Sequence, residues 1–127
     1  MLCYFDKMDR SEKGIWIVED DPSIKEAIKI ILEEEGYSTA TFENGESVRK
    51  LLGKESPNLI LLDILLGEED GKEICKDLKN KFNVPIVLMS ANNFTDKDIK
   101  NSMADNYLKK PFDLNTLVRT VKRFAKP

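Results

Sequence analysis

The chain has 127 residues, of which 41% are hydrophobic and 34% charged, and its formal net charge is −3. This length suits one domain with a buried core, and no apolar run is long enough to cross a bilayer or to serve as a secretory signal. We therefore expect a globular, cytoplasmic protein. The scattered lysine and arginine residues predict no direct binding to nucleic acid or to a membrane.

The sequence contains no histidine and has two cysteines. Without histidine, Ser-His and Cys-His nucleophile pairs, histidine-ligated zinc and a histidine phosphocarrier are excluded. Cys3 and Cys75 lie far apart in the sequence and are expected to be reduced, with Cys75 packed as a small core residue. Any chemistry must therefore depend on carboxylates, lysines and hydroxyls.

Residues 15–18 form a short apolar run that predicts a first strand, and three acidic residues follow its carboxyl end. A helix is expected next, because apolar residues recur at helical spacing until Gly36, which suits a left-handed C-cap. Ser23 and Glu26 have the spacing of a capping box near the start of this helix.

Two further strands and a helix complete the first half of the chain. Residues 37–42 are rich in β-branched and aromatic side chains, which is typical of a more exposed strand. Asn44 can cap a helix that stops around Gly53. Residues 59–62 are apolar throughout, which indicates a strand that is buried on both faces and delivers Asp63 at its carboxyl end.

The alternation of helix and strand continues after Gly71, where a helix is predicted. A second buried strand, 86–89, ends at Ser90. The following helix, 96–102, has a capping box and offers only Ile99 and Met103 to the core.

A short strand at 107–110 is stopped by Pro111, and Asp113 can cap the last helix. The apolar stripe predicted for this last helix consists of Leu114, Leu117, Val118, Val121 and Phe124.

Five strands that alternate with five helices predict an α/β domain, a doubly wound parallel sheet covered by helices on both faces. Such sheets bind ligands outside the carboxyl ends of the strands, where the strand order reverses. If the order is 2-1-3-4-5, the first and third strands flank this point. Glu19 and Asp20 would then lie beside Asp63.

Carboxylates that converge at one edge of a sheet repel one another unless a cation neutralises them. Oxygen ligands without histidine or cysteine favour Mg²⁺, which leaves coordination positions for phosphate oxygens. Ser90 and Lys110 end the neighbouring strands and add a hydroxyl and an ammonium group. This set predicts phosphoryl transfer with Asp63 as the nucleophile.

Four motifs occur in this order: Glu-Asp-Asp-Pro at 19–22, the run 59–63 with Gly71 after it, Met-Ser-Ala at 89–91, and Tyr-Leu-Lys-Lys-Pro-Phe at 107–112. Together they resemble the receiver domain of two-component response regulators, over about 15–124. The resemblance implies a flavodoxin-like fold, with 1–14 as an N-terminal extension and 15–126 as the receiver domain.

By this resemblance, Asp63 accepts a phosphoryl group with the help of Mg²⁺. The resemblance also implies a Mg²⁺ site in which Asp20 ligates the ion directly and Glu19 assists through water. Asp63 and the backbone carbonyl of Leu65 complete this site. The other implied site residues end the next two strands: Lys110 and Ser90 as phosphoryl contacts, Ser90 and Tyr107 as a switch pair, and Pro111 after a cis peptide bond.

The resemblance also implies that a sensor histidine kinase or a histidine phosphotransfer protein donates the phosphoryl group. The face formed by the helix at 96–102, the strand at 107–110 and the last helix would contact a downstream effector or a second copy. The domain would be no enzyme beyond catalysing its own phosphorylation and dephosphorylation. Gly67 stands where proline is usual, which predicts a more mobile loop.

Other functions remain as alternatives. Each candidate residue alone would more often be a surface or turn residue, and only their occurrence at four strand ends favours a site. A receiver-like scaffold that has lost phosphotransfer would be expected to lack Asp63, Lys110 or one acid of the Glu19–Asp20 pair, and this chain keeps them all. A phosphohydrolase of the haloacid dehalogenase pattern needs a second aspartate where Leu65 stands. A nucleotide-binding domain needs a glycine-rich loop where Glu-Asp-Asp-Pro follows the first strand.

Overall fold

The computed structural model describes residues 14–91 and 95–125. Cys3, residues 1–13 of the predicted N-terminal extension and Lys126 at the predicted domain end lie outside the described residues. The strands are β1 (Ile15–Val18), β2 (Thr39–Phe42), β3 (Leu59–Asp63), β4 (Leu65–Leu66), β5 (Glu69–Asp70), β6 (Ile86–Ser90) and β7 (Asn106–Lys109). The helices are α2 (Pro22–Glu34), α3 (Gly45–Leu52), α4 (Gly71–Lys81), α5 (Asp96–Ser102) and α6 (Leu114–Phe124).

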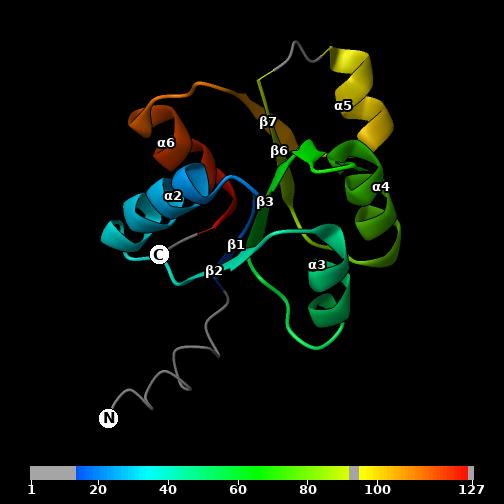
Figure 1. The fold of residues 1–127 in the computed structure, drawn as a ribbon, viewed down its shortest axis with the longest axis horizontal. Helices are drawn as coiled ribbons and strands as arrows, with labels where there is room; N and C mark the ends of the chain where they lie inside the picture. Colours follow the sequence, from blue (N-terminus) through cyan, green and yellow to red (C-terminus); the bar gives the residue numbers. More distant parts are fainter. Residues whose placement is uncertain (1–13, 92–94, 126–127) are drawn as a thin grey trace.

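Five of the strands form one sheet in the order β2-β1-β3-β6-β7, and all neighbouring pairs are parallel. This is the predicted 2-1-3-4-5 order, so the doubly wound α/β fold is confirmed. Helices α2 and α6 cover one face of the sheet, and α3, α4 and α5 lie on the other side (Figure 1). The strand order reverses between β1 and β3, which places their carboxyl ends side by side.

The sheet is buried on both faces because alternate side chains of each central strand point to opposite sides. In β1, Trp16 and Val18 pack in one cluster with side chains of α3 and α4, and Ile15 and Ile17 pack in the other with side chains of α2 and α6. Cys75 belongs to the first cluster, as predicted, and burial raises the pKa of its thiol to about 12. This thiol is therefore a packing group.

Asp21 caps the first helix of the described chain, α2, because its Oδ1 accepts hydrogen bonds from the backbone N–H groups of Ser23 and Ile24 at 2.9 and 3.2 Å. The predicted capping box of Ser23 and Glu26 is wrong, since Pro22 already occupies the first helical position. The end of this helix is as predicted, with Gly36 at a positive φ of 97°.

Two predicted core positions are wrong. Met103 is 41% exposed, because it is the left-handed C-cap that follows α5, with φ 67°, and no longer continues the apolar face of the helix. Leu114 is 53% exposed at the first position of α6, and Thr120 is buried on this helix instead. Within the described ranges, none of the helices has the length and apolar character needed to traverse a lipid bilayer.

We expect the amides of α5 to exchange with solvent faster than those of the other helices named above. Only Ser102 is buried among the seven residues of α5, so little packing opposes its local opening. Hydrogen exchange followed by NMR measures this directly, and phosphorylation should increase the protection of α5. Equal protection in all these helices would contradict the expectation.

Candidate functional site

Three carboxylates meet at the carboxyl edge of the sheet. Val18 of β1 pairs with Leu62 of β3, so Glu19, which follows β1, lies beside Asp63, the last residue of β3. Glu19 is 1% exposed and Asp63 5% exposed, whereas the neighbouring Asp20 is exposed. The three predicted acidic residues therefore lie together, two of them held by packing and one at the surface.

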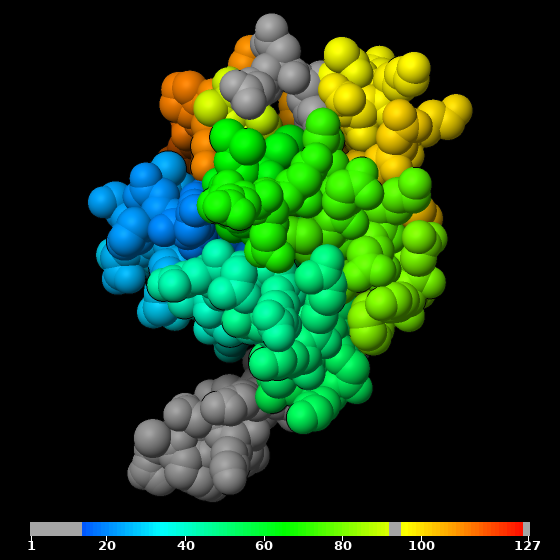
Figure 2. All heavy atoms as spheres, turned by 45° about the vertical axis from the view of Figure 1, so that its right-hand side comes forward, coloured from blue at the N-terminus to red at the C-terminus, as the bar shows by residue number. Residues whose placement is uncertain are grey.

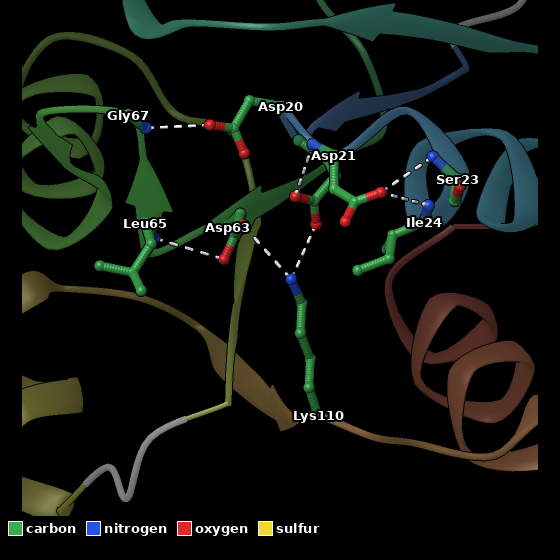
Figure 3. A network of polar contacts seen from close by, with 9 residues as sticks. Asp20, Asp21, Ser23, Ile24, Asp63, Leu65, Gly67 and Lys110 are labelled. Carbon is green, nitrogen blue, oxygen red and sulfur yellow. Dashed lines mark hydrogen bonds and ion pairs between the residues drawn. The ribbon is translucent and has the colours of Figure 1, made fainter.

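Lys110 lies directly after β7 and reaches across the edge of the sheet into this acidic group (Figure 3). Its Nζ is 2.8 Å from Oε1 of Glu19 and 3.2 Å from Oδ2 of Asp63. Its backbone N–H donates to the carbonyl oxygen of Ser90 at 2.7 Å, which fixes the start of the lysine side chain against β6. The ammonium group thus pairs with both buried carboxylates.

The electrostatics of this group reflect its burial. Burial, together with a hydrogen bond to Asp63, raises the pKa of Glu19 to about 7, and its hydrogen bond to Lys110 acts in the opposite direction. Burial works to lower the pKa of Lys110, but the hydrogen bond to Glu19 and the charge of Asp63 raise it overall. Lys110 is therefore charged at neutral pH. Its single positive charge does not neutralise all of the carboxylates around it.

The arrangement fits a divalent cation. One carboxylate oxygen from each of Glu19, Asp20 and Asp63 lies within 4.8 Å of the others. With all three carboxylates ionised, they and the ammonium of Lys110 carry formal charges of −3 and +1, which leaves −2 for a cation to neutralise. Oxygen-only donors of this net charge are those that Mg²⁺ prefers.

The other predicted site residues lie around this group. Ser90 is 3% exposed at the end of β6, and Tyr107 on β7 pairs in register with Leu88. The peptide bond between Lys110 and Pro111 is cis. Ser90, Lys110 and Pro111 lie at the edge that carries the carboxylates, whereas Tyr107 lies within β7, two residues before the end of that strand.

The segment after Asp63, which includes the loop predicted to be more mobile, has regular structure. It forms a small antiparallel hairpin of β4 and β5, in which Leu65 pairs with Asp70. The N–H of Leu65 donates to Oδ1 of Asp63 at 3.3 Å, and the N–H of Gly67 donates to Oδ2 of Asp20 at 3.0 Å (Figure 3). The hydrogen bond from Gly67 to Asp20 was not predicted from the sequence. The only sequence signal for it is that glycine stands at 67 where proline is usual.

An apolar groove of about 480 Å³ lies next to the site, between α2 and the segment that leads into α6. Its lining includes Ile28 and Leu117 and, near the site, Ala91 and Lys110. Since the three carboxylates are not part of this lining, the groove adjoins the site and is not its reaction centre.

Comparisons with known proteins agree with this fold. The family model "Response regulator receiver domain" matches residues 15–122. The chain is 38% identical over 117 residues to the transcriptional regulatory protein CrdR of Helicobacter pylori, covering 89% of this chain and 55% of that protein. It is 35% identical over 117 residues to the DNA-binding response regulator MtrA of Mycolicibacterium smegmatis, covering 91% and 51%.

Solved structures give the same result. A two-component response regulator from Clostridium difficile is 33% identical with a TM-score of 0.80, covering 89% of this chain and 95% of that one. The receiver domain of a signal transduction histidine kinase from Syntrophus aciditrophicus is 36% identical with a TM-score of 0.76, covering 87% and 89%.

The chain belongs to the response regulator receiver domain family. Members of this family are phosphoacceptor signalling domains of two-component systems, which work with histidine kinases and effector domains. The chain spans about half the length of the two relatives from Helicobacter and Mycolicibacterium.

Proposed function

We propose that this chain accepts a phosphoryl group on Asp63 in a reaction that requires Mg²⁺. The observation that carries the proposal is the pairing of the buried Asp63 with Lys110 at 3.2 Å, beside the acidic side chains of Glu19 and Asp20. The receiver domain is assigned to 15–126, with 1–14 as an extension. As for other receivers, the site of action is the cytoplasm.

The donor must be another protein or a small phosphorylated molecule, because the chain has no histidine of its own. A sensor histidine kinase or a histidine phosphotransfer protein fits this requirement. A carboxylate oxygen of Asp63 forms the new P–O bond, and the electron pair of the broken P–N bond stays on the imidazole of the donor. The ammonium of Lys110 stabilises the negative charge on the phosphoryl oxygens.

In this proposal Asp20, Asp63 and the backbone carbonyl of Leu65 would ligate Mg²⁺, and Glu19 would assist through water. The bound cation supplies positive charge that offsets the repulsion between the carboxylates and the incoming phosphoryl group. Glu19, the most deeply buried of the three acids, orients Lys110 through their 2.8 Å contact. Hydrolysis of the aspartyl phosphate at the same site would return the domain to its resting state.

The signal would leave the site through Ser90 and Tyr107. Ser90 is buried at the end of β6, one strand away from Asp63, and Tyr107 lies half-buried on the adjacent β7. In the proposal, Ser90 turns to a phosphoryl oxygen, and Tyr107 fills the space that it leaves. The face of α5, β7 and α6 then binds a downstream effector or a second copy of the chain.

The test is incubation with acetyl phosphate and Mg²⁺, followed by intact-mass measurement. We expect a gain of one phosphoryl group that disappears with a chelator and in Asp63→Asn. The matched control is Asp77→Asn, which removes a half-exposed carboxylate on α4 that pairs with Arg49 and Lys81, away from the candidate site, and it should be phosphorylated normally.

A chain that gains no mass with acetyl phosphate or with a phosphorylated histidine phosphotransfer protein would instead be a constitutive scaffold. A gain that persists in Asp63→Asn would place the modification on another residue. The phosphohydrolase alternative has no support in the geometry, because the exposed apolar side chain of Leu65 cannot act as an acid or base.

A further inference from the structure

The turn of the β4–β5 hairpin contacts the metal-binding edge through its backbone. Gly67 occupies this turn with φ 61°, a left-handed conformation that glycine adopts without strain. Its N–H donates to Oδ2 of Asp20, a residue 47 positions earlier in the chain, at 3.0 Å. The other oxygen of Asp20 points toward Asp63 (Figure 3). The two oxygens of this carboxylate therefore have different partners.

The donor at Gly67 is held in place from several sides. Leu66 beside it is 3% exposed and anchors the hairpin in the core. After the turn, Glu69 accepts a hydrogen bond from the N–H of Gly45 at 2.9 Å, and the N–H of Gly71 donates to the carbonyl oxygen of Ile64 at 2.7 Å. This part of the chain lies at the surface, next to the start of α3 (Figure 2). The hairpin is thus exposed but fixed.

Asp20 needs such a partner more than the other two acids do. Glu19 and Asp63 are buried, so packing and Lys110 restrict their side chains, whereas Asp20 is exposed. A free carboxylate must lose rotamer freedom when it ligates a cation, and a preformed hydrogen bond removes part of that cost. Fixing Oδ2 leaves the second oxygen directed to the cluster.

We propose that the backbone N–H of Gly67 is a positioning group, which orients Asp20 for Mg²⁺ and thereby links the β4–β5 hairpin to occupancy of the cation site. This inference rests on the proposed Mg²⁺ site. A proline at 67 cannot perform this role, because it lacks the N–H and its φ is fixed near −65°. The glycine is therefore a functional donor here and does not merely loosen the loop.

Substitutions at 67 test whether the cation site depends on the N–H of Gly67 and on the left-handed turn that presents it. A Cβ at this position would meet no atom within 4 Å, so side chains fit without collision. Gly67→Pro removes the donor, whereas Gly67→Asn keeps it and tolerates a left-handed backbone. Isothermal titration with Mg²⁺ should show about tenfold weaker binding for Gly67→Pro and binding within about twofold of wild type for Gly67→Asn. Thermal unfolding checks that both variants are folded.

A spectroscopic readout tests the contact without any metal. In the metal-free wild-type protein, the amide of Gly67 should exchange about tenfold more slowly than in Asp20→Ala, and its ¹H shift should lie further downfield. Titration with Mg²⁺ should then move the same resonance in the wild-type protein. Together, these results would show that the N–H of Gly67 donates to Asp20 and that Mg²⁺ binding changes this hydrogen bond.

The outcomes that overturn the inference are distinct from failure of the proposed function. If wild type binds Mg²⁺ but Gly67→Pro binds it equally tightly, or Gly67→Asn loses as much affinity as Gly67→Pro, the positioning role is wrong. An amide of Gly67 that is unaffected by Asp20→Ala also overturns it. If the wild-type protein binds no Mg²⁺, the proposed function itself fails, and the positioning role fails with it.

Discussion

Lys110→Met is expected to lower the rate of Asp63 phosphorylation by acetyl phosphate about a hundredfold, the effect of removing one preorganised charge from a site where negative charge accumulates. The ammonium of Lys110 lies 3.2 Å from Oδ2 of Asp63, so it can reach oxygens of a phosphoryl group on that side chain. Methionine has a similar length and keeps the packing of the stem, but it offers neither charge nor donor. The rate is measured by intact mass against time at saturating Mg²⁺.

The same variant should also be less stable without Mg²⁺. Lys110 compensates the buried carboxylates of Glu19 and Asp63, and removal of one partner from a buried ion pair costs about 3 kcal/mol in the free energy of unfolding. Because Mg²⁺ supplies positive charge to the same carboxylates, its addition should restore part of the loss. Urea denaturation with and without Mg²⁺ measures both quantities.

Lys109→Met is the matched control for Lys110→Met, because it makes the same substitution one residue earlier, at an exposed position on β7. It should leave the phosphorylation rate and the unfolding free energy nearly unchanged. An equal loss in the two variants would show that the general charge of this strand end, and not the contact of Lys110 with Asp63, sets the rate.

The fold and the cluster of site residues could be predicted because both follow from local sequence patterns. The apolar runs at 59–62 and 86–89 are short and end at polar residues, which favours strands that are buried on both faces, and such strands are typical of a parallel sheet. Once the strands are parallel and their order is set, residues that follow them must meet at one edge. Glu19, Asp63 and Lys110 lie together for this topological reason.

The parts that could not be predicted depend on tertiary contacts. The β4–β5 hairpin has only two residues in each strand, too few for a periodic signal, and the hydrogen bond from Gly67 to Asp20 joins segments 47 residues apart. Met103 and Leu114 carry apolar side chains at helix ends, where helical periodicity no longer fixes which side faces the core. Apolar spacing alone therefore overestimated the core there.

A second large effect is expected at Gly71, the first residue of α4, where alanine should lower the unfolding free energy by about 3 kcal/mol. A Cβ at this position would collide with the backbone carbonyl oxygen of Asp63 and would lie 2.7 Å from Cα of Ile64. Both are backbone atoms, so no side chain can rotate to make room. The start of α4 and the end of β3 would have to move apart.

Gly53→Ala is the matched control for Gly71→Ala, because Gly53 has a right-handed backbone with φ −81° and nothing within 4 Å of the added Cβ. Alanine there should change the unfolding free energy little or raise it by about 0.5 kcal/mol, since it restricts the unfolded chain. Urea denaturation of both variants gives the comparison. Moving the backbone of Asp63 also displaces its carboxylate from Lys110, so folded Gly71→Ala should accept phosphoryl groups more slowly than Gly53→Ala. Equal stability and equal rates in the two variants would mean that α4 and β3 can move apart at Gly71 without destabilising the protein or disturbing the site.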